Sequence, residues 1–120
     1  LTRLDSPDIF KGLTNLKNLH LNRNQLTSIN ENVFNNLVKL EVLSLKSNRI
    51  QSIHVRTFEN LSDLKELSLS NNKLNELDSK LFINLAKLER LELDNNNLEL
   101  IECVRTLKKL NYLTLNNNKI

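Results

Sequence analysis

The stretch LERLELDNNNL, residues 88–98, sets regularly spaced leucines around three consecutive asparagines. Four other segments share its form, LxxLxLxxNxL, with isoleucine as the last residue in two of them. They read LKNLHLNRNQL (16–26), LEVLSLKSNRI (40–50), LKELSLSNNKL (64–74) and LNYLTLNNNKI (110–120). The period is therefore 24 residues three times and then 22. Five copies in 120 residues indicate a repeat architecture.

The alternating leucines of each LxL predict a short strand, with leucines facing one way and the residues between them facing the other. One repeat cannot cover its own leucines, so stacked neighbours must bury them. After each strand an asparagine stands at a fixed offset, where its amide can serve backbone groups that the turn leaves unpaired. We expect these side chains to form a buried structural ladder rather than an ordinary loop. They are Asn24, Asn48, Asn72, Asn96 and Asn118.

The second half of each unit also repeats, with a phenylalanine followed three residues later by leucine. Phe10, Phe34, Phe58 and Phe82 are expected to form a second core spine, a more economical interpretation than a ligand-binding aromatic stripe. The unit at 88–109 lacks this phenylalanine and is two residues shorter. Cys103 is the single cysteine, and a free cysteine commonly packs as a small buried hydrophobe. The alternative for Cys103 is an intermolecular disulfide or a redox site.

These motifs resemble the leucine-rich repeat family in its typical 24-residue form, LxxLxLxxNxLxxLxxxxFxxL, over essentially the whole chain. The resemblance implies an α/β solenoid: a right-handed arc with a concave parallel β-sheet and an irregular or short-helical convex side. We expect one domain, 1–120, that is a fragment of a longer ectodomain. It divides into a partial repeat 1–15, repeats 16–39, 40–63, 64–87 and 88–109, and a partial repeat 110–120.

The variable residues between the strand leucines would face outward on the concave side, where a partner could bind. Early repeats contribute basic side chains and the repeat at 88–97 contributes acidic ones, a pattern that favours an elongated protein partner with complementary charges. The candidate binding residues are His20, Arg23, Lys46, Arg90, Glu92, Asp94 and Tyr112, with Tyr112 as the aromatic anchor. A solvated polar face without a ligand remains the alternative.

Nothing in the sequence favours catalysis. Glu92 and Asp94 would lie on one strand, but on an open surface, and a calcium site at Asp94 would need more oxygen ligands than its neighbours offer. His20 and His54 fall on opposite sides of the solenoid. We therefore expect no enzyme, no cofactor and no metal. Acids and bases are interleaved around a net charge of +3, and no apolar run spans a membrane, so we expect neither nucleic-acid binding nor membrane insertion.

The version of the repeat that contains phenylalanine looks like extracellular members such as Toll-like receptors and arthropod leucine-rich immune proteins. The resemblance therefore implies a protein-binding module of a secreted or membrane-anchored receptor, in innate immunity by analogy. Asn60-Leu61-Ser62 is the only N-glycosylation sequon, so Asn60 is the candidate glycan site. Two alternatives remain open: a structural scaffold that forms homo- or hetero-oligomers, and an intracellular adaptor, which the shorter 22-residue unit resembles.

Overall fold

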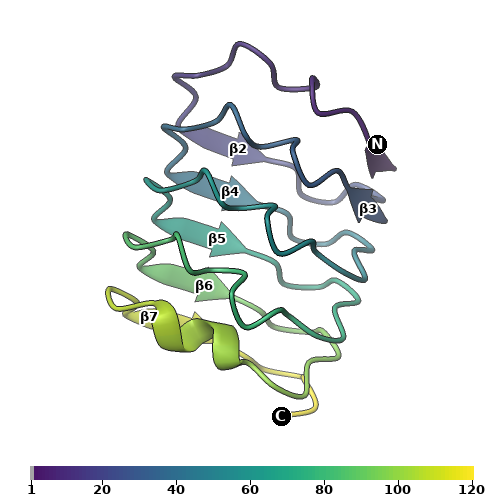
Figure 1. The fold of residues 1–120 in the computed structure, drawn as a ribbon. Helices are drawn as coiled ribbons and strands as arrows, with labels where there is room; N and C mark the ends of the chain where they lie inside the picture. Colours follow the sequence, from purple (N-terminus) through teal and green to yellow (C-terminus); the bar gives the residue numbers. More distant parts are fainter. Residues whose placement is uncertain (1) are drawn as a thin grey trace.

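The computed structural model describes residues 2–120 as a solenoid of stacked parallel strands (Figure 1). One face is a five-stranded parallel sheet in the order β2-β4-β5-β6-β7. Its strands are β2 (Asn18–His20), β4 (Val42–Ser44), β5 (Glu66–Ser68), β6 (Arg90–Glu92) and β7 (Tyr112–Thr114). A second, two-stranded parallel sheet pairs β1 (Arg3–Leu4) with β3 (Ser28–Ile29). The fold expected from the repeat is therefore confirmed.

The strand register follows the sequence period. Leu19 pairs with Leu43, and the same pairing continues through Leu67 and Leu91 to Leu113. Each strand leucine therefore lies directly beside its counterpart in the next repeat. Because successive strand residues point to opposite faces, one pattern repeated at a constant spacing produces a continuous apolar layer inside and a continuous polar layer outside.

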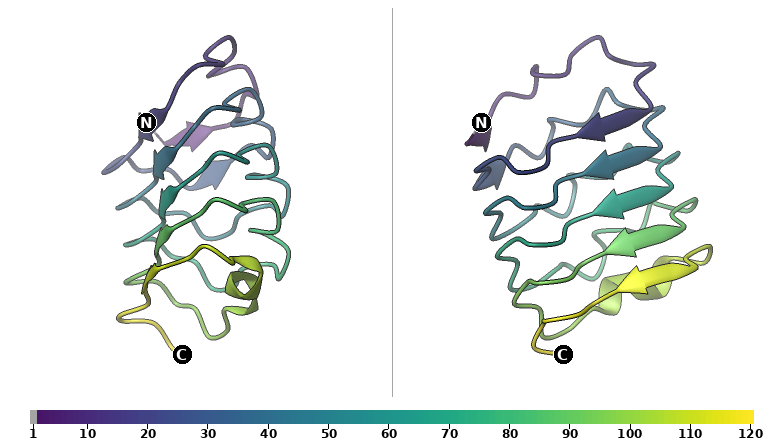
Figure 2. Two further views of the ribbon diagram at one scale, coloured as in Figure 1. Left: turned by 90° about the vertical axis from the view of Figure 1, so that its left-hand side faces the viewer. Right: turned by 180° about the vertical axis from the view of Figure 1, so that it is seen from behind.

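Opposite the sheet, the chain runs through irregular turns (Figure 2, left). Four phenylalanine rings stack beneath these turns, with centroids 6.1, 6.3 and 6.2 Å apart from Phe10 through Phe34 and Phe58 to Phe82. The spine ends at the short repeat, where a 3-10 helix, η1 (Glu102–Thr106), places fully buried Cys103 in the core instead. Within residues 2–120, η1 is the only helix, so the convex side is built mainly from hydrogen-bonded turns.

The asparagines after the strands bond to backbone groups of their own and the preceding repeat. Asn48 Nδ2 donates to the carbonyl oxygens of Leu21 and Leu45 at 2.9 Å each, and Asn48 Oδ1 accepts from Leu26 N at 3.1 Å. Asn72 and Asn96 make the same set of contacts. A side chain with both donors and an acceptor thus satisfies the backbone where the chain leaves the sheet.

The residue before each of these asparagines has a left-handed backbone. The φ angles are 56° at Arg23, 60° at Ser47, 58° at Asn71, 56° at Asn95 and 57° at Asn117. Residues other than glycine visit this region at a cost, and asparagine does so most readily. Sequence analysis treated Arg23 simply as a candidate binding residue, whereas the backbone conformation at this position is the same in every repeat.

Charged side chains on the approach to the sheet pair between neighbouring repeats. Glu41 Oε1 lies 3.5 Å from Lys17 Nζ, and Glu41 Oε2 lies 3.1 Å from Lys65 Nζ. Similarly, Lys87 Nζ lies 2.7 Å from Asp63 Oδ1. The hydrogen bond and charge of Lys65 lower the pKa of Glu41, and Lys87 does the same to the pKa of Asp63. These ion pairs join neighbouring repeats, but they are exposed to solvent and add little to stability.

Candidate functional site

The exposed surface of the five-stranded sheet is formed by the outward residues of β2, β4, β5, β6 and β7 and the short segments after them. We call it the outer sheet face; Figure 2 (right) shows its five parallel strands. Pairing aligns the outward residues in rows that cross the strands. One row runs from His20 through Ser44, Ser68 and Glu92 to Thr114, and another runs from Asn18 through Val42, Glu66 and Arg90 to Tyr112.

The β2–β4 end of the outer sheet face carries exposed basic side chains. His20, Arg23 and Lys46 are all exposed, and none of them forms an ion pair with a residue in the described range 2–120. Lys46 follows β4, and Glu92 lies on β6, two strands away, about 10 Å at the usual strand spacing. The basic groups are therefore available to a ligand rather than neutralised within the fold.

At the β6–β7 end, the candidate residue Arg90 contacts two others, Tyr112 and Glu92. The Arg90 guanidinium carbon lies 3.7 Å from the centroid of the Tyr112 ring, a cation–π geometry, and Arg90 Nε lies 3.5 Å from Glu92 Oε1. Tyr112 keeps 40% of its surface exposed. The arginine thus orients both the aromatic ring and the carboxylate, leaving a half-exposed ring on an ordered support.

Asp94 is tied to the chain on both sides. Its Oδ1 accepts a hydrogen bond from Asn116 N at 2.8 Å, and its backbone N–H donates to Ser70 Oγ at 3.1 Å. One carboxylate oxygen therefore fixes the segment after β7. The arrangement of Asp94 gives it a structural contact in addition to the binding role that sequence analysis suggested.

Small serines occupy the centre of the outer sheet face. Ser44, Ser68 and Ser70 stand at outward positions by register, but they are only 9%, 8% and 2% exposed. Ser44 Oγ donates to Asn22 Oδ1, while Ser68 Oγ has no hydrogen-bond partner in the described chain. The centre of the outer sheet face is therefore formed by small, nearly buried polar side chains, between the basic β2–β4 end and the end that carries Tyr112. Outward direction along a strand does not by itself give exposure, and this is why sequence analysis missed it.

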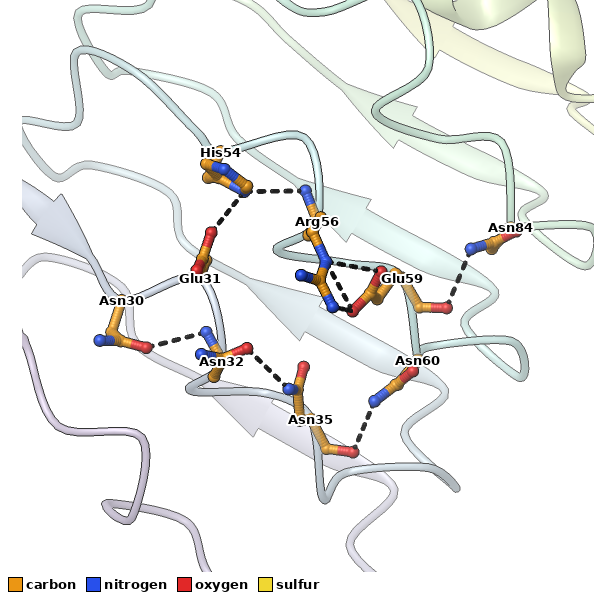
Figure 3. A network of polar contacts seen from close by, with 9 residues as sticks. All are labelled: Asn30, Glu31, Asn32, Asn35, His54, Arg56, Glu59, Asn60 and Asn84. Atoms are coloured by element: carbon orange, nitrogen blue, oxygen red, sulfur yellow. Dashed lines mark hydrogen bonds and ion pairs between the residues drawn. The ribbon is translucent and has the colours of Figure 1, made fainter.

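Asn60 lies on the opposite, turn-bearing side (Figure 3). Its side chain is exposed, and Nδ2 donates to the carbonyl oxygen of Asn35 at 3.3 Å; Asn84 makes the equivalent contact with Glu59 at 3.2 Å. Nearby, His54 Nδ1 lies 2.8 Å from Glu31 Oε2 and 3.1 Å from Arg56 N. Asn60 is thus far from the outer sheet face, and within residues 2–120 its side chain forms one hydrogen bond, at the surface.

Burial governs the chemistry of Cys103. Its side chain is completely buried, and this burial raises the pKa of the thiol to about 11. Since the thiolate is the reactive form, the folded protein holds this cysteine in its unreactive state. The buried-packing interpretation fits these facts, because a disulfide to another chain would need the sulfur to reach the surface.

Across residues 2–120, no group of three His, Cys, Asp or Glu side chains is arranged to hold a metal ion. No helix in that range has the length and apolar character needed to cross a bilayer.

Comparison with known proteins identifies related sequences and folds. A family model described as leucine rich repeat matches residues 2–50 and 38–98. No curated protein matches the chain significantly.

Three solved structures illustrate the similarity. A TLR13–ssRNA13 complex superposes with a TM-score of 0.90 at 37% identity, covering 98% of this chain and 17% of that one. The Drosophila Toll–Spatzle complex, described as a hub in development and innate immunity, gives 0.90 at 27% identity, covering 94% and 17%. A leucine-rich repeat protein of Leptospira interrogans gives 0.78 at 40% identity, covering 88% and 26%. The chain thus spans about a quarter or less of each of these proteins.

Proposed function

Since this chain belongs to the leucine-rich repeat family, we propose that it is a non-catalytic module whose outer sheet face binds another protein. The observation that carries the proposal is the state of its charges. Lysines and acids at the sides of the solenoid pair between repeats, whereas His20, Arg23 and Lys46 stand exposed and unpaired within the described chain. A rigid sheet that holds basic groups in order suits recognition of a complementary acidic segment.

The outer sheet face also suggests how the partner is oriented. An acidic segment would lie over β2 and β4, and a segment able to pack on the half-exposed ring of Tyr112 would lie over β7. Aromatic residues near arginine are frequent anchors in interfaces. Glu66, Glu92 and Asp94 lie between these ends and would repel a continuous phosphate backbone. We therefore favour a protein over the RNA named for the TLR13 structure, and RNA is an outcome of the test.

The binding test compares charge-reversed proteins. Wild-type protein, the double variant His20→Glu/Lys46→Glu and the control Lys39→Glu/Lys73→Glu are each screened against an array of extracellular proteins and against single-stranded RNA. Both Lys39 and Lys73 are exposed and lie off the outer sheet face. A protein bound by wild type and by the control, but at least about tenfold more weakly by the double variant, supports the proposal.

Other outcomes of this screen would overturn it. Equal losses in both variants would show only a general charge effect. Binding of RNA in place of protein would replace the partner class, and a protein contact that changes only with turn-side residues would favour the scaffold alternative.

We also propose an extracellular location, in a secreted or membrane-anchored protein with a role in recognition such as innate immunity, by analogy with Toll. In this setting Asn60 carries an N-linked glycan. Its side chain is exposed, and attachment of the glycan at Nδ2 affects only one hydrogen bond within residues 2–120, which lies at the surface. A glycan there would lie on the turn-bearing side and leave the outer sheet face open.

The glycan test uses protein secreted from eukaryotic cells. Wild-type protein should lose mass on treatment with an amidase that removes N-linked glycans, whereas Asn60→Gln and Ser62→Ala should not. Asn84→Gln is the matched control, since Asn84 makes the same contact without a sequon. Absence of a glycan from secreted wild-type protein would contradict the proposal.

A further inference from the structure

The side of the solenoid that carries β1 and β3 changes character along the chain. In the first two units, Thr27 N donates to Thr2 O at 3.0 Å and the β1–β3 pairing continues the contact. In later units the corresponding segments, 51–53, 75–77 and 99–100, form no backbone hydrogen bonds to one another within the described chain. Their N–H and C=O groups are therefore left for solvent or for a ligand.

A groove of about 290 Å³ lies along these unpaired segments, between the repeats 64–87 and 88–109. It is lined by Asn75, Glu76, Leu77, Ser79, Glu99, Leu100 and Glu102. A mainly apolar hollow of about 230 Å³ adjoins it and shares Leu100 and Glu102. Leu100 is 65% exposed, the largest exposed fraction among the large hydrophobic side chains of the described residues. We call the two together the side groove.

The side groove carries three acidic side chains that have no partner within the described chain. Glu76, Glu99 and Glu102 form no ion pair or hydrogen bond with other described residues, whereas Glu41 and Asp63 are paired with lysines of the next repeat. No lysine or arginine lines the larger of these two hollows, and Arg105 lines the smaller, mainly apolar one. Three unpaired carboxylates beside an exposed leucine offer both charge and an apolar contact to the same ligand.

We propose that the side groove binds an extended cationic peptide segment, in which lysine or arginine alternates with a large apolar residue. The apolar side chain covers Leu100 in the hollow, and the cations pair with Glu76 and Glu99. The free N–H and C=O groups of 75–77 and 99–100 hydrogen-bond the main chain of the peptide, as in other forms of strand addition. This surface is separate from the outer sheet face and allows two partners to bind at once.

The test uses two fluorescein-labelled peptides, Gly-Lys-Leu-Arg-Leu-Lys-Gly and its acidic counterpart Gly-Glu-Leu-Glu-Leu-Glu-Gly. Fluorescence polarisation at low and at high salt measures binding, and amide NMR shifts locate it. We expect the cationic peptide alone to bind, more weakly at high salt, with shifts centred on residues 75–79 and 99–105. Glu76→Gln/Glu99→Gln should weaken binding about tenfold and Leu100→Ser about fivefold.

Matched controls separate the groove from general effects. Glu66→Gln removes an exposed carboxylate from the outer sheet face, and Ile83→Ser removes a turn-side hydrophobe that is 56% exposed. Both variants should change binding of the cationic peptide less than about twofold. The same is expected of His20→Glu/Lys46→Glu, which alters the outer sheet face. A failure of the side-groove inference is therefore distinguishable from a failure of the proposed function. The inference is overturned if the cationic peptide does not bind, if both peptides bind alike, or if the controls weaken binding as much as the groove variants.

Discussion

Replacing Asn96 by alanine should destabilise the protein far more than the same change at Asn97. Asn96 is 6% exposed; its Oδ1 accepts from Leu74 N at 3.1 Å, and its Nδ2 donates to the carbonyl oxygens of Leu69 and Leu93 at 3.0 and 3.2 Å. Alanine leaves the buried N–H of Leu74 without a partner and removes one amide donor from each of the two carbonyls, which keep Asn72 and Asn118 as their other donors. A single buried unsatisfied group costs about 1–3 kcal/mol, and since the two amide-to-carbonyl hydrogen bonds are lost as well we expect a total loss of about 3 kcal/mol.

The exposed side chain of Asn97 forms no hydrogen bond with the rest of the described chain, and only its backbone N–H donates, to Leu74 O at 2.8 Å. Asn97→Ala should therefore change stability by less than about 0.5 kcal/mol. Urea unfolding followed by circular dichroism measures both variants, with thermal melting as a second observable. For Asn96→Ala the melting temperature should fall by about 10 °C. Equal losses at the two positions, or a loss at Asn97 alone, would refute the assigned hydrogen bonds.

Three further predictions concern single side chains. Thr57 is 1% exposed with an unpaired Oγ1, so Thr57→Val should raise the urea-unfolding free energy by about 1 kcal/mol; a loss would mean that the hydroxyl has a partner. Cys103, with its thiol pKa raised to about 11, should react with a disulfide reagent at neutral pH only after unfolding, and fast labelling of the native protein would contradict its burial. Lys65→Met should return the lowered pKa of Glu41 toward its ordinary 4.5 in a carboxyl NMR titration. Because folding lowers the pKa of Glu41, the ion pair contributes stability above about pH 4.5, and this contribution is lost as pH falls through the lower folded value. The Lys65→Met variant should therefore lose less stability than wild type on acidification. The same loss of stability with falling pH in both proteins would exclude a contribution from the pair.

The fold could be predicted from the sequence because one short pattern recurs and each copy must bury its leucines on the next. The register of Leu19 on Leu43 and of Leu67 on Leu91 is the sequence period expressed as strand pairing. The phenylalanine spine was visible for the same reason, since Phe34 and its equivalents recur at one position. Periodicity therefore carries nearly all the information about the core.

The surface was less predictable, because it depends on side-chain sizes in neighbouring repeats rather than on position. Ser68 stands at an outward strand position between Ser44 and Glu92 but is only 8% exposed. The side groove also escaped notice. It arises because segments 75–77 and 99–100 form no backbone hydrogen bonds to each other. The sequence pattern of a single repeat does not indicate whether it pairs with its neighbour at this place. The charge pairing of Glu41 with Lys65 could have been found from the sequence, by comparing the same position one repeat apart.

The run of three asparagines at 95–97 shows how one residue type meets three different physical demands. Asn95 adopts a φ of 56°, a left-handed conformation that asparagine tolerates better than most residues. Asn96 bonds to backbone groups of two repeats, and Asn97 is exposed. The first demand concerns the backbone alone, and hence arginine at 23 and serine at 47 fill the equivalent position with φ angles of 56° and 60°. The second needs a donor and an acceptor on one short side chain, which is why asparagine stands there in all five copies.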